Sequence, residues 1–141
     1  MLYKSFSPKD TEKIAADFAK TLKSGDVICL NGDLGVGKTA FVQGLATALG
    51  VLEYVSSPTF TIVNTYYGDM AINHFDVYRI SDSEEMFEIG FDEYIDGDGI
   101  SVIEWPELIA DILPDERFEI TITKNLDLGL DYREITIEKR G

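Results

Sequence analysis

Cysteine, histidine and basic residues are scarce in this chain of 141 residues, and each shortage excludes a class of site. Cys29 is the only cysteine, so no internal disulfide can form, and its apolar stretch at 27–30 predicts a buried, inert thiol. His74 is the only histidine, so a histidine-based zinc cluster or acid/base triad has no support. No segment approaches the roughly 18 consecutive apolar residues of a membrane span.

The charge balance also limits the partners of the protein. Lys and Arg number 12 against 26 Asp and Glu, which gives a formal net charge of −14. Direct binding to nucleic acid usually depends on a field of Lys and Arg that releases counterions from phosphates. We therefore expect any role in a nucleic-acid process to run through another protein, with the few basic groups serving a small phosphate ligand.

Length and composition predict one compact domain over residues 1–141, because 45% of the residues are hydrophobic and no linker or repeat interrupts them. The first residues lack the apolar core of a secretion signal, and we expect a cytoplasmic protein without membrane contact.

Capping residues and hydrophobic spacing predict two helices around a glycine-rich loop. Ser7 and Pro8 begin a helix that ends by Gly25, and a second helix runs from Lys38 to Gly50. Strands are expected at 27–30, 60–67, 71–78, 100–105, 118–123 and 133–138, with short helices at 83–89 and 106–113. The turn at 68–69 joins two of these strands into a hairpin, so the expected fold is α/β, a three-layer P-loop NTPase-like domain with a mixed β-sheet.

The strongest chemical signal is the glycine-rich loop at 32–39, which satisfies G-x-x-x-x-G-K-[ST] between a strand and a helix. Its backbone N–H groups and the helix N-terminus suit phosphate oxygens. Lys38 would reach the β- and γ-phosphates, and the Thr39 hydroxyl would ligate Mg²⁺. We expect ATP or ADP to contact Asp33, Leu34, Gly35, Val36, Gly37, Lys38, Thr39 and Ala40.

Phosphate chemistry at such a loop also needs a carboxylate beside the magnesium ion, and two residues are candidates. Asp76 ends the stretch 72–76, whose alternation predicts a half-exposed strand, and a bond to a structural amide or to Arg79 is the other interpretation of its side chain. Glu104 ends the stretch 100–104, which is more uniformly apolar and predicts a buried strand.

Other P-loop classes fit less well. The guanine-binding pattern N/T-K-x-D fails because Asp127 falls one residue late, and the D-x-x-G match at 96–99 precedes a strand instead of following one. A kinase acting on small metabolites would use several arginines to clamp two phosphorylated substrates, and this chain has only four arginines in all. Such a kinase, or a nucleotide-dependent switch that does not hydrolyse its ligand, remains the alternative to an ATPase.

Four motifs together resemble the bacterial TsaE (YjeE) family. They are the loop at 32–39, Ser-Pro-Thr-Phe at 57–60, His-Phe-Asp-Val-Tyr-Arg at 74–79 and Val-Ile-Glu-Trp-Pro at 102–106. The resemblance covers nearly the whole chain. It implies a small ATPase required for the threonylcarbamoyl modification of adenosine 37 in ANN-decoding tRNAs, acting with TsaD and TsaB and touching tRNA only indirectly. Slow turnover is expected without partners, because no strong arginine finger is evident.

The resemblance also assigns roles to particular residues. It implies that Lys38 and Thr39 bind nucleotide and Mg²⁺, that Glu104 is a magnesium-shell or catalytic carboxylate, and that Asp76 assists at the same centre. Thr59, in a switch-like loop at 57–59, would face the γ-phosphate or the attacking water, with a turn that opens a strand as the other interpretation of this loop.

Four further positions concern the nucleotide itself. Trp105 resembles the aromatic residue of the family that packs near nucleotide, although a core role fits equally well. Thr11 and Arg133 correspond to contacts with nucleotide, with helix capping or a surface ion pair as the other interpretation. Ala40 stands where many members have a second threonine, so a hydroxyl contact to the α-phosphate is missing.

Overall fold

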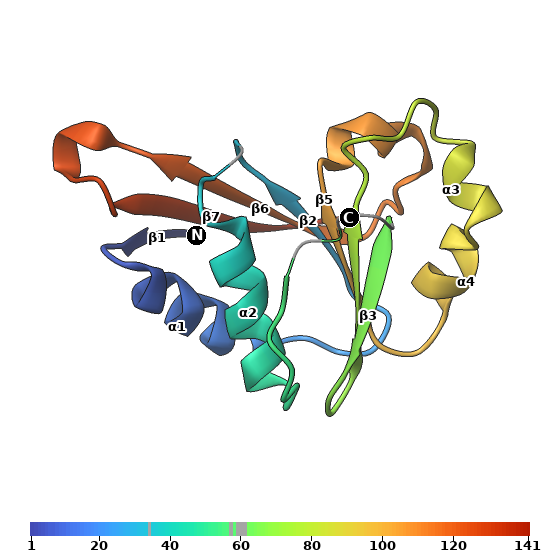
Figure 1. Ribbon diagram of the computed structural model, residues 1–141, viewed down its shortest axis with the longest axis horizontal. Helices are drawn as coiled ribbons and strands as arrows, with labels where there is room; N and C mark the ends of the chain where they lie inside the picture. Colours follow the sequence, from blue (N-terminus) through green and yellow to red (C-terminus); the bar gives the residue numbers. More distant parts are fainter. Residues whose placement is uncertain (34, 57, 59–61) are drawn as a thin grey trace.

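A seven-stranded sheet forms the centre of the computed structural model, which describes residues 1–33, 35–56, 58 and 62–141. The strand order is β1-β7-β6-β2-β5-β4-β3 (Figure 1). The strands are β1 Leu2–Ser5, β2 Val27–Asn31, β3 Val63–Tyr67, β4 Ala71–Asp76, β5 Ile100–Glu104, β6 Arg117–Lys124 and β7 Arg133–Arg140. The α-helices are α1 Pro8–Ala19, α2 Lys38–Ala48, α3 Glu85–Glu88 and α4 Phe91–Asp96, and 3₁₀ helices span η1 Pro106–Ile112 and η2 Leu126–Leu128.

The sheet is mixed, as the sequence predicted. Strands β6, β2, β5 and β4 run parallel to one another, whereas β7 and β1 at one flank and β3 at the other are added by antiparallel pairing. The carboxyl ends of the parallel strands therefore meet at one edge, which is where open α/β sheets bind their ligands.

Helices cover both faces of the sheet and produce three layers. The first core joins α1 and α2 to the sheet through Phe18, Phe41, Leu45, Ile28, Leu30, Ile72 and Val102. The second core packs α3, α4 and η1 against the other face through Val27, Phe75, Ile103, Met86, Phe91 and Ile109. In Figure 1, α1 and α2 lie side by side in the left half of the view, and α3 and α4 lie at its right-hand end.

The first helix begins as the sequence predicted and ends earlier. Ser7 accepts a hydrogen bond of 3.1 Å from the N–H of Asp10, and Pro8 occupies the first turn. The α-helix stops at Ala19 because the next N–H groups, from Lys20 to Leu22, bond three residues back and tighten the chain into turns before Gly25.

Other segments differ from the expectations. Strand β1 and helix α4 had no prediction, and the segment at 106–112 is a 3₁₀ helix. The four residues of β1 are too few for periodicity to show, and only pairing with β7 makes them a strand. The predicted half-exposed strand at 72–76 is wrong, because β4 lies between β3 and β5 under helices on both faces and its polar Asn73 and His74 are buried.

The start of the predicted hairpin, at 60–61, lies outside the described residues, whereas β3 and β4 form the expected antiparallel pair from Val63 onward. Among the helices described, none combines the length and the apolar character needed to cross a bilayer.

Candidate functional site

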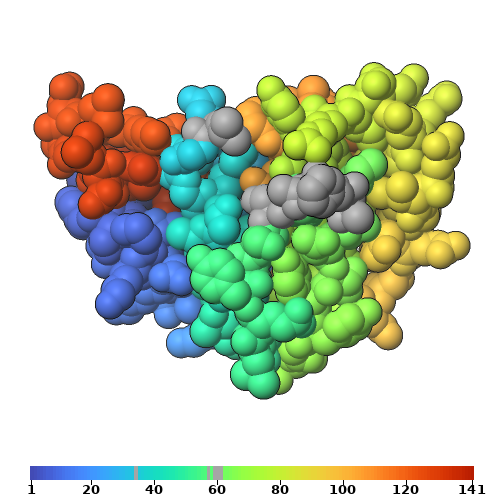
Figure 2. Space-filling model, viewed as in Figure 1, coloured from blue at the N-terminus to red at the C-terminus, as the bar shows by residue number. Residues whose placement is uncertain are grey.

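The glycine-rich loop leaves β2 after Asn31 and enters α2 at Lys38, at the carboxyl edge of the parallel strands. Gly35 and Gly37 adopt φ angles of 76° and 109°, a region that side chains rarely occupy. At Gly32 a Cβ atom would lie 2.8 Å from the carbonyl oxygen of Ile122. The glycines therefore permit both the turn of the loop and its close approach to β6. In Figure 2 this blue-green segment reaches the surface between the red β6–β7 hairpin and the yellow-green segment after β4.

Lys38, the first residue of α2, turns its ammonium group inward to the end of the sheet. Its side chain is only 6% exposed, and Nζ donates to the carbonyl oxygen of Gly32 at 2.8 Å. The same Nζ lies 3.7 Å from Oε1 of Glu104 and 4.0 Å above the centroid of the Trp105 ring. Strands β2 and β5 are neighbours with Leu30 opposite Glu104, so the sheet itself brings the lysine and the carboxylate together.

Glu104 is buried at the end of β5 and makes a second close contact. Its Oε2 lies 2.6 Å from Nε2 of His74, whose side chain is completely buried. The other ring nitrogen of His74, Nδ1, has no hydrogen-bond partner in the part of the chain that the structure describes. The two oxygens of Glu104 therefore face different groups, His74 on one side and Lys38 on the other.

Asp76 lies beside Glu104, because the two residues are opposite each other in the pairing of β4 with β5. Its Oδ1 accepts a 3.0 Å hydrogen bond from the backbone N–H of Tyr78. This bond to a structural amide is the interpretation that the sequence left open for Asp76. The carboxylate is nevertheless only half-buried at the same edge as Glu104, and a role with magnesium stays a prediction.

Trp105 directly follows Glu104 and has a φ of 62°, the only positive φ among the described residues other than glycine. This left-handed conformation turns the chain sharply from β5 into η1, where Pro106 occupies the first turn. The half-buried ring contacts Lys38 on one side, and the Tyr78 ring lies 4.9 Å away between centroids. The tryptophan is thus part of the site, and its contact with nucleotide stays a prediction.

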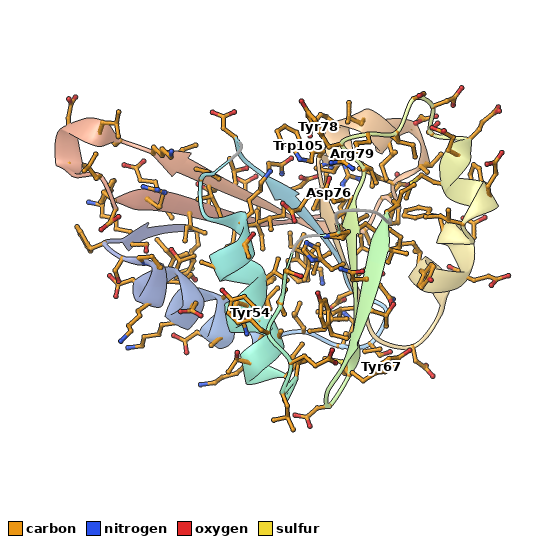
Figure 3. The ribbon with its side chains drawn as sticks, in the orientation of Figure 1. Tyr54, Tyr67, Asp76, Tyr78, Arg79 and Trp105 are labelled. Carbon is orange, nitrogen blue, oxygen red and sulfur yellow. The ribbon has the colours of Figure 1, made fainter. Side chains whose placement is uncertain are left out.

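The side-chain view shows how these groups gather. Asp76, Tyr78, Arg79 and Trp105 lie close together at one end of the sheet, whereas Tyr54 and Tyr67 lie at the far end (Figure 3). Tyr78 is 62% exposed and leaves an aromatic surface open beside the buried lysine.

Arg133 and Thr11 have structural partners. Nε of Arg133 donates to the carbonyl oxygen of Val36 at 2.7 Å, so the first residue of β7 holds the loop in place. Thr11 is 3% exposed and its hydroxyl lies 2.7 Å from that of Ser5. For Thr11 this buried pair competes with the predicted contact to the nucleotide, which stays a prediction.

The remaining predicted positions lie in α2, in the loop before it, or outside the described residues. Thr39 and Ala40 lie in the first turn of α2, and Asp33, Gly35, Val36 and Gly37 lie in the loop before it. Leu34 and Thr59 lie outside the described residues, so the predicted switch-like loop at 57–59 is described only at Pro58.

His74 is the site residue that the sequence reasoning missed. The scarcity of histidine argued against a histidine-based site, and the ring was given no other role. The sequence could have indicated His74, because alternate residues of a strand share a face and Ile72, His74 and Asp76 therefore lie on one face of β4. The pairing of β4 with β5 places Glu104 on the same face of the sheet.

Cys29 is buried, as the sequence predicted, and the inertness of its thiol stays a prediction. Its side chain is fully buried in β2. Burial, assisted by the negative charge of Glu119, raises the pKa of Cys29 from its ordinary value of 9.0 to about 12.

The family model described as "Threonylcarbamoyl adenosine biosynthesis protein TsaE" matches residues 5–134. The chain belongs to the TsaE family. This membership places it among the proteins of tRNA threonylcarbamoyladenosine biosynthesis and confirms the resemblance carried by the four motifs.

Relatives in the TsaE family match over most of their length. TsaE of Bacillus subtilis is 44% identical over 99% of this chain and 85% of the relative. TsaE of Treponema pallidum is 42% identical over 94% of this chain and 96% of the relative. The crystal structure of Bacillus subtilis YdiB matches with a TM-score of 0.82 and 39% identity, over 100% of this chain and 86% of that one. The fold is therefore that of the TsaE family, an α/β domain of the P-loop type.

Proposed function

We propose that the chain is a Mg²⁺-dependent ATPase that supports the threonylcarbamoyl modification of adenosine 37 in ANN-decoding tRNAs. One observation carries the proposal. The ammonium group of Lys38 is buried where the glycine loop meets the end of β5, 3.7 Å from the Glu104 carboxylate. A cation for phosphates and a carboxylate for magnesium or water are thus already adjacent.

The residues present fit a nucleoside triphosphate. Nothing lies within 4 Å of the positions where Cβ atoms would stand on Gly35 and Gly37, so the loop backbone is open to a ligand. Gly37 supplies no side chain to cap α2, which leaves the first turn of the helix suited to phosphate oxygens.

The same residues fit magnesium better than a metal held by protein alone. Among the described residues no group of three or more His, Cys, Asp or Glu side chains could hold a metal ion. Mg²⁺ usually takes one or two carboxylates, waters and substrate phosphates. The Thr39 hydroxyl and the carboxylates of Glu104 and Asp76 are the oxygen donors that would hold it.

Hydrolysis transfers the γ-phosphoryl group of ATP to water and yields ADP and phosphate. When bound, Mg²⁺ would neutralise charge on the β- and γ-phosphates. Lys38 would exchange the carbonyl of Gly32 for phosphate oxygens, and Oε1 of Glu104 would orient the attacking water. In this proposal Thr59 senses the γ-phosphate, and Trp105, Arg133 and Thr11 contact the nucleotide or its loop.

The proposed partners are TsaD and TsaB, in the cytoplasm. A net charge of −14 favours contact with tRNA through such proteins over direct binding. Turnover alone should be slow, since Arg117 pairs with Glu119 and Arg133 binds backbone carbonyls, so neither is held ready for the γ-phosphate.

The test is the rate of Mg²⁺-ATP hydrolysis by the purified chain, alone and with TsaB and TsaD. We expect a slow basal rate that rises with the partners and is abolished in Lys38→Met, which keeps the length of the side chain without its charge. Binding is followed separately through the fluorescence of Trp105, the only tryptophan.

Other outcomes identify the alternatives. Transfer of labelled γ-phosphate to a small acceptor would show a kinase. Full support of tRNA modification by Glu104→Gln, with ATP bound and not hydrolysed, would show a switch.

A further inference from the structure

His74 makes a buried contact with Glu104, the proposed catalytic carboxylate. The proposed function gives His74 no role in binding the nucleotide or in hydrolysis. We propose that His74 is a positioning residue: its Nε2–H holds Oε2 of Glu104, so that Oε1 stays directed at Lys38 and at the substrate. This inference rests on the proposed ATPase function and names the group that orients its carboxylate.

The sheet makes the contact possible. In the parallel pairing of β4 with β5, His74 lies opposite Val102, and Glu104 lies two residues further along the same face. The imidazole therefore reaches diagonally to the carboxylate, and the 2.6 Å separation of Nε2 and Oε2 is that of a strong hydrogen bond. Both side chains are almost fully buried, at 0% and 4% exposure, so water does not compete for this bond.

The surroundings of the ring decide which nitrogen carries the proton. A ring with its proton on Nδ1 would turn the lone pair of Nε2 toward the carboxylate, which is repulsive at this distance. It would also bury an N–H without an acceptor, because Nδ1 has no partner in the described part of the chain. The contact therefore requires a proton on Nε2, and His74 donates to Glu104.

Among the described residues, His74 alone donates a side-chain hydrogen bond to the Glu104 carboxylate. Lys38 lies 3.7 Å from Oε1, beyond hydrogen-bond length, and its ammonium already donates to Gly32. A carboxylate rotates broadly about its last bond unless a hydrogen bond fixes it. Without His74, the plane of the carboxylate would turn away from its present orientation, and fewer molecules would present an oxygen to water in the reactive geometry.

The first test uses the wild-type chain without nucleotide, so it is independent of the proposed function. His74 is the only histidine, and its two ring nitrogens are therefore assigned in a ¹⁵N spectrum of histidine-labelled protein. We expect the proton on Nε2, and a changed Nε2 signal in Glu104→Gln. A ring without a proton on Nε2, or an Nε2 signal that Glu104→Gln leaves unchanged, would overturn the inference.

The second test separates positioning from structural support. In His74→Phe, which keeps a ring without a donor, kcat should fall 10- to 100-fold while KM and nucleotide affinity change less than about twofold. His74→Gln, whose amide nitrogen can replace Nε2, should recover at least part of kcat.

The control is Phe75→Leu, the next residue of β4, whose side chain packs in the opposite core. It should lower stability with kcat retained. If His74→Phe retains wild-type kcat, or loses no more than Phe75→Leu at equal stability, the residue only fills space. If the wild-type chain hydrolyses no ATP even with TsaB and TsaD, the proposed function fails, whereas the labelled spectrum still reports whether His74 holds Glu104.

Discussion

Helices α1 and α2 cross at Gly44, and this contact decides whether replacing Gly44 by alanine stabilises or destabilises the protein. Gly44 lies within α2 and faces α1. A Cβ atom added there would stand 2.3 Å from the carbonyl oxygen of Glu12, 2.6 Å from its Cα and 2.8 Å from its carbonyl carbon. All three atoms belong to the backbone, so no side-chain rotation can relieve the overlap.

Two opposing effects set the magnitude for Gly44→Ala. Helix propensity alone would stabilise the protein by about 1 kcal/mol. Ordinary contact begins at 3.4 Å, so the helices must separate by about 3.4 − 2.3 = 1.1 Å at this point. A gap of that size forfeits about a quarter to a half of the dispersion attraction, and overpacking costs about 1–3 kcal/mol or more. Taking about 3 kcal/mol for the clash, we expect a net loss of about 2 kcal/mol.

Urea unfolding of Gly44→Ala measures this loss as a lower midpoint with an unchanged m-value. Glu12→Ala is the matched control, since it shortens the side chain and leaves the clashing backbone in place. The double variant should remain destabilised by Gly44→Ala to the same extent. Equal or greater stability of Gly44→Ala relative to the wild type would refute the reasoning.

Three further predictions concern the loop and the buried thiol. Gly32→Ala should lower the free energy of unfolding by at least about 2 kcal/mol, because its Cβ atom would meet a backbone oxygen at 2.8 Å. Gly35→Ala has open space around its Cβ atom at a φ of 76° and should cost about 1 kcal/mol. Equal losses of the two variants in urea unfolding would contradict this expectation. Arg133→Lys keeps the positive charge and loses the planar guanidinium group that binds the Val36 carbonyl. The affinity for nucleotide should therefore fall about fivefold, equivalent to about 1 kcal/mol, in a titration followed by Trp105 fluorescence. Wild-type affinity would argue against a role of Arg133 in holding the loop. The Cys29 thiol should resist a thiol reagent at pH 8 until the chain unfolds. Because its pKa is raised in the folded state from 9.0 to about 12, its contribution to stability is complete below pH 9 and is lost as the pH rises toward 12; rapid labelling of the folded protein at pH 8 would contradict the burial.

Part of the structure could be predicted from the sequence because it depends on residues that are close together in the chain. Ser7 and Pro8 begin α1 because a side-chain acceptor and a fixed φ suit that position wherever the chain lies. The loop from Gly32 to Lys38 could be predicted for the same reason, since its glycines, its lysine and the start of the helix lie within one short segment. The buried strand ending at Glu104 was also predicted, because continuous apolar residues indicate burial on both faces.

Contacts between distant segments could not be predicted in this way. The alternation in β4 indicated a half-exposed strand, and only the helices packed on both faces of the sheet show that Asn73 and His74 are buried. Arg133 is far from Val36 in the sequence, and only the position of β7 beside β6 brings its guanidinium to the loop.

Three features of this protein could be recognised from its amino acids alone: the glycine-rich phosphate-binding motif, the carboxylate at the end of a buried strand and the motifs of the TsaE family. Each of these depends on residues adjacent in the chain, where bonding geometry fixes their relation. The tertiary structure decided that His74 contacts Glu104, that Lys38 lies over Trp105 and that Gly44 meets the backbone of α1. Those relations depend on strand register and helix packing, which many separate residues set together by burying apolar surface.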